Sequence, residues 1–203
     1  ILIPSRKGSK GLKNKNLLTI KKKSLVEISI LFSKKIIKND TIFVSSDSKK
    51  VKEICNKNSV NFIKRPIKLS GDRISDFQVI EHSLSVIKNN YKYLIYLQPT
   101  SPLRDELELK KAMMIMIKKK PHAIYSISSM DKKFHPLKIF KKNSKNFINL
   151  NDNNGKNIIA RQQLKDYYIR NGVFYIFAIK ELKKNKHIYP KKIFGFETVN
   201  KSV

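Results

Sequence analysis

A cluster of basic side chains near the start of the chain could bind a highly charged anion. Residues 1–3 are apolar and read as a buried strand, and the polar segment 4–17 after them carries Arg6, Lys10 and Lys15 with two glycines. Glycines free the backbone to present N–H groups, and several separate cations suit a triphosphate, whose charge is spread over more than one phosphate. Neither the P-loop nor the dinucleotide-binding glycine pattern is present. A basic surface turn without a ligand is the alternative that this segment leaves open.

Two more polar segments follow apolar runs. Small hydroxyl side chains in 44–48 follow a second predicted strand, and Asp47 there fits the N-cap of a helix over 49–58. Gln98, Thr100 and Ser101 follow the strongly apolar fourth predicted strand, 93–97, in a loop that two prolines stiffen. Gln98 can both donate and accept hydrogen bonds, as recognition of a base or a sugar edge requires. Each segment by itself also fits a structural role, as a helix cap or a rigid turn.

The polar segments lie between predicted strands and predicted helices, which alternate along the chain. Apolar runs alternate with amphipathic stretches of helical periodicity, which favours a mainly parallel sheet covered by helices. Ligands of such sheets bind beyond the carboxyl ends of the strands, so we expect the polar segments to meet at one edge. The predicted strands are 1–3, 41–44, 60–63, 93–97 and 123–127, and the predicted helices are 25–37, 49–58, 75–88 and 105–118.

The alternation breaks after residue 128. Segments 137–140 and 147–150 resemble a hairpin around a polar turn, 167–169 is a further apolar stretch, and 173–177 is typical of a core strand. No repeat and no linker between domains is visible. We therefore predict one domain over 1–203, with a β-rich excursion over about 129–170.

The net charge of +29 on 203 residues suggests a nucleic-acid binder at first sight. However, six of the 44 basic residues are arginine and 38 are lysine, and they are scattered over every segment. Abundant Lys, Ile and Asn are what AT-rich codons encode, whereas nucleic-acid readers rely on arginine and on placed aromatic residues. We predict no specific nucleic-acid partner, although the charge should attract anionic ligands.

The remaining composition narrows the class of protein further. No apolar run approaches the roughly 20 residues of a membrane-spanning helix, so we expect no membrane partner. The single cysteine, Cys55, cannot form an internal disulfide and shares a helix face with Val51, which predicts a core thiol in a cytoplasmic protein. The four histidines have no metal-like spacing, which argues against zinc.

Taken together, the polar segments resemble the acylneuraminate cytidylyltransferases, the CMP-sialic acid synthetases. The similarity runs through practically the whole chain, and its first and fourth blocks are long. The matching blocks, in order, are Ile3-Pro4-Ser5-Arg6 to Lys15-Asn16-Leu17, Ser45-Ser46-Asp47, Arg65-Pro66 with Leu69 and Asp72, Leu97-Gln98-Pro99-Thr100-Ser101-Pro102-Leu103-Arg104, His135-Pro136 with Lys138, Arg161-Gln162, and Asn171-Gly172 with Tyr175.

The resemblance implies a fold, a reaction and partners. The fold would be a three-layer α/β/α, Rossmann-like nucleotidyltransferase fold with a mainly parallel sheet, and the excursion 129–170 would be a dimerisation arm of a homodimer. The reaction would join CTP to an acidic nine-carbon 2-keto acid sugar of the sialic, legionaminic or pseudaminic type. Its products would be the CMP-sugar and pyrophosphate, and its cofactor Mg²⁺.

The resemblance also implies roles for individual residues. The catalytic set would be Arg6, Lys15 and Gln98. Lys138 and Arg161 would reach toward the site of the neighbouring subunit. The nucleotide-binding residues would be Arg6, Ser9, Lys10, Lys15, Asn16, Arg65, Ser75 and Asp76, and the sugar-binding residues Gln98, Thr100, Ser101, Lys138, Arg161 and Gln162.

The sequence departs from the family pattern in two ways. The family's metal-binding aspartates follow a segment like 197–203, so we expect the metal ligands just after Val203 and none within the chain. Ser5 and Lys7 replace the commoner Ala and Gly, and Asp76 stands where some relatives carry Ser. The high charge and the missing carboxylates keep a second hypothesis open, a polyanion-binding protein on an inactive fold of this type. A glycosyltransferase of similar architecture is disfavoured, because the chain has no internal Asp-x-Asp.

Overall fold

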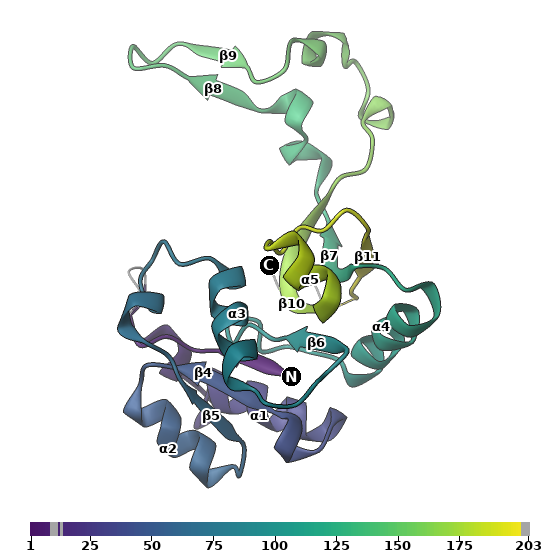
Figure 1. Ribbon diagram of the computed structural model, residues 1–203. Coiled ribbons are helices and arrows are strands. Elements are labelled where there is room, and N and C mark those ends of the chain that lie inside the picture. Colours follow the sequence, from purple (N-terminus) through teal and green to yellow (C-terminus); the bar gives the residue numbers. More distant parts are fainter. Residues whose placement is uncertain (9–11, 13, 200–203) are drawn as a thin grey trace. The chain divides into compact units, whose positions relative to one another are not determined.

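Short strands that are buried on both faces form the centre of the protein. Leu2 and Ile3 are neighbours on the first strand and point to opposite faces, yet both are fully buried. Such strands need a layer of helices on each side. The computed structural model, which describes residues 1–8, 12 and 14–199, contains helices on both sides (Figure 1).

The main sheet has seven strands in the order β11-β7-β10-β6-β1-β4-β5. Strand β1 pairs in parallel with β4 and β6, β4 pairs in parallel with β5, and β10 is antiparallel to β6. The sheet is therefore mostly parallel, as the sequence predicts. Its strands are β1 (Leu2–Pro4), β4 (Phe43–Ser46), β5 (Asn61–Lys64), β6 (Tyr93–Tyr96), β7 (Ala123–Ser129), β10 (Tyr168–Ala178) and β11 (Ile193–Glu197).

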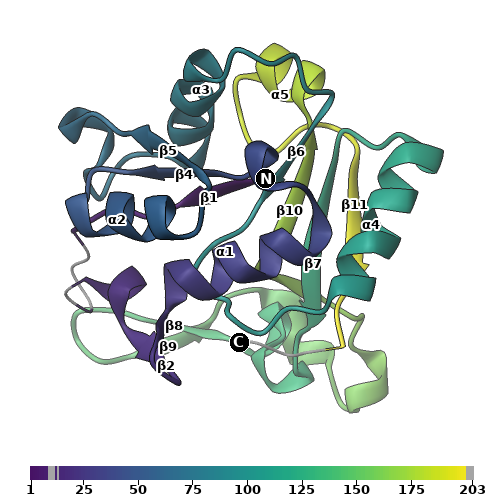
Figure 2. The ribbon, with the colours of Figure 1, turned by 90° about the horizontal axis from the view of Figure 1, so that it is seen from below.

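Five α-helices of the described residues cover the two faces of this sheet. Figure 2 shows α1, α2 and α4 along one face, where Ile30, Cys55 and Met116 belong to one buried cluster with the strands. On the other face, Phe77 and Leu84 of α3 and Leu182 of α5 line a shared cavity. This arrangement confirms the predicted three-layer α/β/α fold. The helices are α1 (Leu25–Ile36), α2 (Lys49–Lys57), α3 (Asp76–Val86), α4 (Glu106–Lys119) and α5 (Ile179–Asn185).

Local capping signals define the starts of three predicted helices. Ser24 accepts a hydrogen bond from the backbone of Glu27, Ser75 forms a capping box with Gln78, and Asp105 caps α4. The prediction that Asp47 caps α2 is wrong, because its Oδ1 accepts a hydrogen bond of 2.7 Å from the backbone N–H of Lys7 instead. The loop after β1 passes close enough to β4 to supply that donor.

The chain divides into two compact units, one comprising residues 1–126 and 171–203 and the other residues 127–170. The smaller unit covers the segment that the sequence sets apart as an excursion. Its strands β8 (Phe140–Lys142) and β9 (Ile148–Leu150) form a hairpin as predicted, but the first strand begins at residue 140 and not at 137, because 136–138 is a 3₁₀ turn. The side chain of His135 accepts a hydrogen bond from the backbone of Leu137 and thereby favours the turn.

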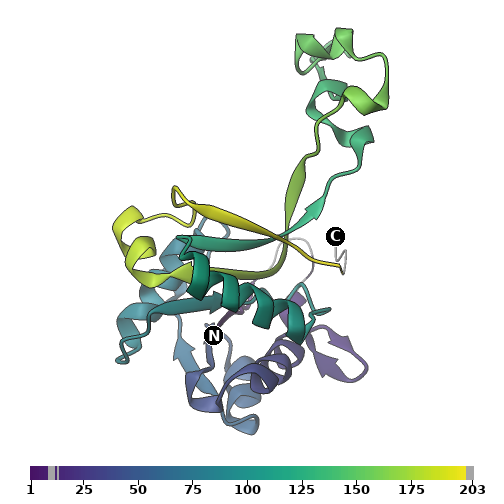
Figure 3. The same cartoon turned by 90° about the vertical axis from the view of Figure 1, so that its right-hand side faces the viewer.

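Residues after 167 differ most from the sequence prediction. Residues 168–169 of the predicted segment 167–169, together with the predicted strand 173–177, belong to the single strand β10, which lies between β6 and β7. Helix α5 and strand β11 have no counterpart in the prediction, and β11 forms the edge of the sheet beside β7 (Figure 3). A two-stranded sheet of β2 (Thr19–Ile20) and β3 (Lys23–Ser24) precedes α1.

Two expectations about single features can be checked directly. Cys55 is fully buried, which confirms its core position, and this burial raises the pKa of its thiol to about 12. Across residues 1–8, 12 and 14–199, no helix has both the length and the apolar character needed to cross a membrane.

Candidate active site

The loops after β1, β5 and β6 surround a cavity of about 310 Å³. These three strands belong to the parallel part of the sheet, so their carboxyl ends lie at the same edge. The sequence predicted that the polar segments meet at this edge. Segment 4–17 and the loop that carries Gln98 and Thr100 both line the cavity, as predicted. The cavity is lined by Pro4, Arg6, Lys15, Asn16, Arg65, Leu69, Gly71, Asp72, Ile74, Asp76, Val79, Tyr96, Gln98, Pro99 and Thr100.

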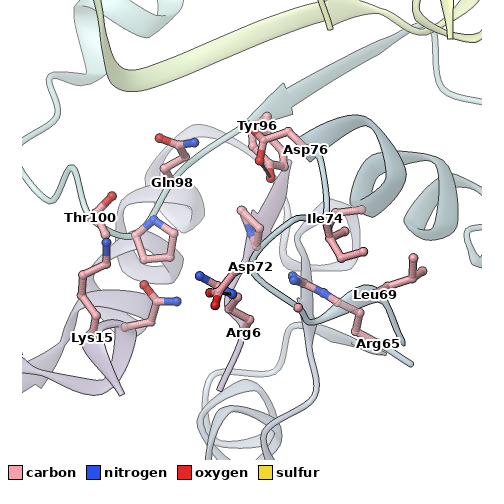
Figure 4. A pocket seen from close by; sticks show the side chains of 15 residues that line it. Arg6, Lys15, Arg65, Leu69, Asp72, Ile74, Asp76, Tyr96, Gln98 and Thr100 are labelled. Carbon is pink, nitrogen blue, oxygen red and sulfur yellow. Dashed lines mark hydrogen bonds and ion pairs between the residues drawn. The ribbon is translucent and has the colours of Figure 1, made fainter. Parts of the chain in front are cut away.

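Arg6 lies between two other cations in this cavity, with Lys15 on one side and Arg65 on the other (Figure 4). Its Nη1 is 2.6 Å from Oδ1 of Asp72 and also donates to the carbonyl of Ser70 at 3.5 Å. Both side chains of the ion pair are about a third exposed, at 31% for Arg6 and 35% for Asp72. An anionic ligand can therefore reach the guanidinium if it displaces a carboxylate.

Lys15 and Asn16 come from a short 3₁₀ turn, Lys15–Leu17. The preceding residue, Asn14, adopts the left-handed conformation with φ 55°, which asparagine tolerates better than most residues. This turn brings both side chains to the cavity wall. Ser9 and Lys10, predicted with them to bind the nucleotide, lie outside the described residues.

Arg65 is a buried cation at the end of β5. It is 4% exposed, its Nε donates to the hydroxyl of Ser45 at 3.1 Å, and its Nη2 donates to the Ser45 carbonyl at 2.7 Å. Burial of the guanidinium lowers the pKa of Arg65, because desolvation disfavours the charged form. The two hydrogen bonds that Arg65 donates to β4 fix its orientation, so it is a preformed positive group in the wall.

Asp76 and Tyr96 form a second polar pair. The Tyr96 hydroxyl donates to Oδ1 of Asp76 at 2.7 Å, and the tyrosine is 1% exposed. Burial, followed by the neighbouring Asp76 carboxylate, raises the pKa of Tyr96 well above its ordinary value, so the hydroxyl keeps its proton. Asp76 begins α3 and lines the cavity. Ser75, predicted with it, is the N-cap of that helix and is not one of the cavity-lining residues.

The loop after β6 contributes Gln98 and Thr100 to the wall. Ser101, predicted beside them, is buried, and its hydroxyl donates to the carbonyl of Asn171 at 3.4 Å instead of lining the cavity. Gly172 follows Asn171 with φ +73°, and a Cβ there would lie 2.8 Å from Oε1 of Gln98. The backbone of β10 thus lies directly against the Gln98 side chain.

The remaining predicted sugar-binding residues belong to the unit 127–170. Lys138 and Gln162 lie in 3₁₀ turns of that unit, and Nη2 of Arg161 is 3.7 Å from Oδ1 of Asp131. Their sugar-binding role stays a prediction.

Asp72 and Tyr96 line the cavity but are absent from the predicted site. Asp72 belongs to one of the sequence blocks that resemble the family. Its ion pair with Arg6 could not be predicted, because the two residues are far apart in the sequence. Tyr96 was predicted as a residue of a buried strand. Only its position at the carboxyl end of that strand indicated that it could belong to the site.

The described residues do not fit a Mg²⁺ site. Magnesium ions in proteins use carboxylate oxygens, and the two carboxylates of the cavity are engaged by Arg6 and by the Tyr96 hydroxyl. Within the part of the chain that the structure describes, no group of three or more His, Cys, Asp or Glu side chains could hold a metal. The predicted Mg²⁺ dependence therefore rests on the resemblance alone.

Comparison with known proteins identifies the family. The model of a protein family described as "Cytidylyltransferase" matches residues 1–201. The chain belongs to the cytidylyltransferase family. This confirms the resemblance found in the sequence motifs.

Relatives of this cytidylyltransferase-family chain carry different names. It is 27% identical over 198 residues to the N-acylneuraminate cytidylyltransferase of Streptococcus agalactiae serotype V, an alignment that covers 97% of this chain and 47% of that protein. It is also 27% identical over 203 residues to the post-translational flagellin modification protein B of Campylobacter coli, with coverage of 93% and 81%. The chain thus spans about half the length of the S. agalactiae relative.

A solved structure supports the fold of this cytidylyltransferase-family chain. CMP:2-keto-3-deoxy-manno-octonic acid synthetase, complexed with CTP, superposes with a TM-score of 0.70 at 14% identity. The superposition covers 97% of this chain and 88% of that structure. At this identity the similarity shows the fold alone.

Proposed function

We propose that this chain transfers the CMP group of CTP to an acidic nine-carbon 2-keto acid sugar, with release of pyrophosphate. The observation that carries the proposal is the gathering of Arg6, Lys15 and Arg65 around one cavity at the carboxyl ends of parallel strands. Two relatives support the choice of substrates, since one is named N-acylneuraminate cytidylyltransferase and a solved synthetase of this fold is complexed with CTP. The single cysteine favours a cytoplasmic location.

The three cations suit the charge changes of this reaction. The anomeric hydroxyl oxygen of the sugar would form a bond to the α-phosphorus and lose its proton, while the bond from that phosphorus to the bridging oxygen breaks. Negative charge then grows on the departing pyrophosphate. Arg6 and Lys15 would bind and orient the triphosphate, and preformed cations stabilise such charge more effectively than water does. Arg65 and Asp76 would contact the cytidine part.

Gln98 and Thr100 would orient the sugar. Both line the cavity from the loop after β6, and the amide of Gln98 can accept from a sugar hydroxyl and donate to its carboxylate. Correct placement of the attacking hydroxyl is a large part of catalysis in reactions of this kind.

The decisive experiment is pyrophosphate release by the natural full-length protein with CTP, Mg²⁺ and a panel of keto acid sugars. The panel contains N-acetylneuraminic, legionaminic and pseudaminic acids, with an eight-carbon 2-keto acid as the comparison. Release that requires both CTP and a nine-carbon acid supports the proposal, and UTP and ATP test the choice of base. Absence of release with every sugar, together with a salt-dependent shift of DNA, would favour the polyanion-binding alternative that the charge of +29 suggests.

Removal of the Asp72 carboxylate should strengthen CTP binding. In the structure Asp72 holds the guanidinium of Arg6 at 2.6 Å, so a triphosphate that binds Arg6 must displace it. An exposed ion pair is worth at most about 1 kcal/mol, and we expect the Kd for CTP of Asp72→Asn to fall roughly two- to fivefold. Isothermal titration of the wild type and the variant measures this change. Weaker CTP binding by the variant would instead show that the carboxylate contributes to nucleotide binding.

We also propose that the unit 127–170 forms the interface of a homodimer. Within this unit nine large hydrophobic side chains are exposed, and Phe147 and Ile159 reach 69% and 94% exposure. So many exposed apolar side chains within 44 residues favour an association surface. The nine residues are Phe134, Ile139, Phe140, Phe147, Ile148, Ile159, Tyr167, Tyr168 and Ile169.

The double variant Phe147→Asp, Ile159→Asp should convert the protein to a monomer. A charge on each of two apolar side chains of an interface disfavours association, since it must be desolvated there. Sedimentation velocity measures the mass of wild type and variant. Leu107→Asp is the matched control, because Leu107 is a similarly exposed hydrophobic residue on α4. A monomeric wild type, or a dimeric double variant, contradicts the proposal.

A further inference from the structure

The loop that carries Gln98 and Thr100 is held at its far end by Arg104. The loop begins directly after β6, contains Pro99 and Pro102, and ends at Asp105, the N-cap of α4. A proline-containing loop of this kind is stiff, but its direction depends on what anchors it to the rest of the protein. The anchor decides where the Gln98 amide points.

Arg104 binds three acceptors that come from three separate segments. Its Nε donates to the carbonyl of Val173 in β10 at 2.8 Å, and its Nη1 donates to the hydroxyl of Ser29 in α1 at 3.2 Å. Its Nη2 donates to the carbonyl of Gln98 itself. The guanidinium also lies over the ring of Phe32, with Cζ 5.9 Å from the ring centroid.

The charge of Arg104 persists at neutral pH. Desolvation lowers its pKa to about 9, which leaves the guanidinium protonated there. Hydrogen bonds from a charged donor are stronger than those between neutral groups, so the three acceptors are held firmly. Lysine, with one ammonium group on a flexible stem, cannot reproduce this planar fork of donors.

A second observation concerns the side-chain amide of Gln98, whose backbone carbonyl Arg104 binds. A Cβ on Gly172 would lie 2.8 Å from Oε1 of Gln98 and 3.2 Å from Oγ of Ser101, so the side chain of Gln98 lies against bare backbone. Gly172 directly precedes Val173, whose carbonyl Arg104 binds. Arg104 therefore fixes the carbonyl of Gln98 and, through β10, the backbone surface that its side chain contacts.

We infer that Arg104 is a positioning residue that sets the orientation of Gln98 for the sugar substrate. This inference rests on the proposed function for its kinetic consequence. The contacts of Arg104 run to Gln98, Val173, Ser29 and Phe32, whereas Arg6, Lys15 and Arg65 are supplied by other loops. Loss of the guanidinium should therefore affect the sugar and spare the nucleotide.

The test compares Arg104→Lys with the wild type and with Ser29→Ala. For Arg104→Lys we expect the kcat/KM for the sugar to fall at least tenfold while the Kd for CTP stays within twofold. Ser29→Ala removes one hydrogen bond of Arg104, together with the bond from the Ser29 hydroxyl to the carbonyl of Leu25, and neither involves Gln98 or β10. This variant should stay within twofold of the wild type in both measurements. If Arg104→Lys weakened CTP binding and sugar turnover to the same extent and also lowered the melting temperature, the role of Arg104 would be merely structural. That result would overturn the inference. Unchanged sugar kinetics in Arg104→Lys would overturn it as well.

A spectroscopic readout separates this inference from the proposed function. The chain has four glutamines, so the side-chain amide signal of Gln98 can be assigned by comparison with Gln98→Ala. In Arg104→Lys this signal should shift, and in Ser29→Ala it should not. A wild type that releases no pyrophosphate with any sugar defeats the proposed function, yet the amide signal still decides the role of Arg104. Should Arg104→Lys fail to fold, Arg104→Gln, which keeps an N–H donor without the buried charge, takes its place.

Discussion

Alanine at Arg6 or at Lys15 should each lower CTP-dependent turnover at least tenfold and leave the fold intact. Both side chains line the cavity, and each would donate charge-assisted hydrogen bonds to the triphosphate. A hydrogen bond to a charged group contributes roughly 1.5–3 kcal/mol, and about 1.4 kcal/mol corresponds to a factor of ten in rate. Neither side chain belongs to the buried core, so the free energy of unfolding should change little.

The measurement is kcat/KM for CTP from pyrophosphate release, with thermal unfolding of the same preparations. Lys7→Ala is the matched control, because Lys7 is exposed and contributes its backbone N–H, not its side chain, to the contact with Asp47. The control should keep wild-type turnover and rule out a general effect of net charge. Folded Arg6→Ala and Lys15→Ala proteins with full turnover would remove the triphosphate role from both residues.

Gly172→Ala should damage both stability and turnover. At φ +73° an L-residue is strained by roughly 1–2 kcal/mol, and the added Cβ would lie 2.8 Å from Oε1 of Gln98. The contact is with the end of a side chain, so Gln98 must move. We expect unfolding to become easier by about 1–3 kcal/mol. Because misplacement of a reacting group by about 1 Å can lower a rate about a hundredfold, turnover of the sugar should fall at least tenfold.

Chemical denaturation and sugar kinetics measure the two effects of Gly172→Ala. Gly71→Ala is the control, since a Cβ there would only reach ordinary contact distance, 3.9 Å from Ile74. Its free energy of unfolding should stay within about 1 kcal/mol of the wild type. A stable Gly172→Ala protein with wild-type sugar kinetics would show that Gln98 needs no support from β10.

Patterns within short stretches predicted much of the fold. Helix α1 ends within one residue of its prediction, and α3 and α4 begin beside Ser75 and Asp105, because helical periodicity and N-caps are local properties. The parallel sheet followed from the alternation of strands and helices. The insertion of β10 between β6 and β7 did not, because strand order depends on contacts between residues far apart in the chain.

The sequence by itself determined which segments carry the candidate chemistry. The basic loop with Arg6 and Lys15 and the polar loop with Gln98 and Thr100 both follow predicted strands, and the family motifs sit in those loops. Parallel strands bring their carboxyl ends to one edge, so the meeting of these loops follows from the pattern alone.

Only the tertiary structure decided how those side chains are partnered. Asp47 binds the Lys7 backbone instead of capping α2, Ser101 turns to Asn171, and Asp72 pairs with Arg6. Each of these partners comes from a different loop or strand, and a hydrogen bond or ion pair forms with whichever group the fold brings within about 3 Å. The spacing of these residues along the chain does not predict which of them lie close together. Only the packing of the sheet and helices brings them together.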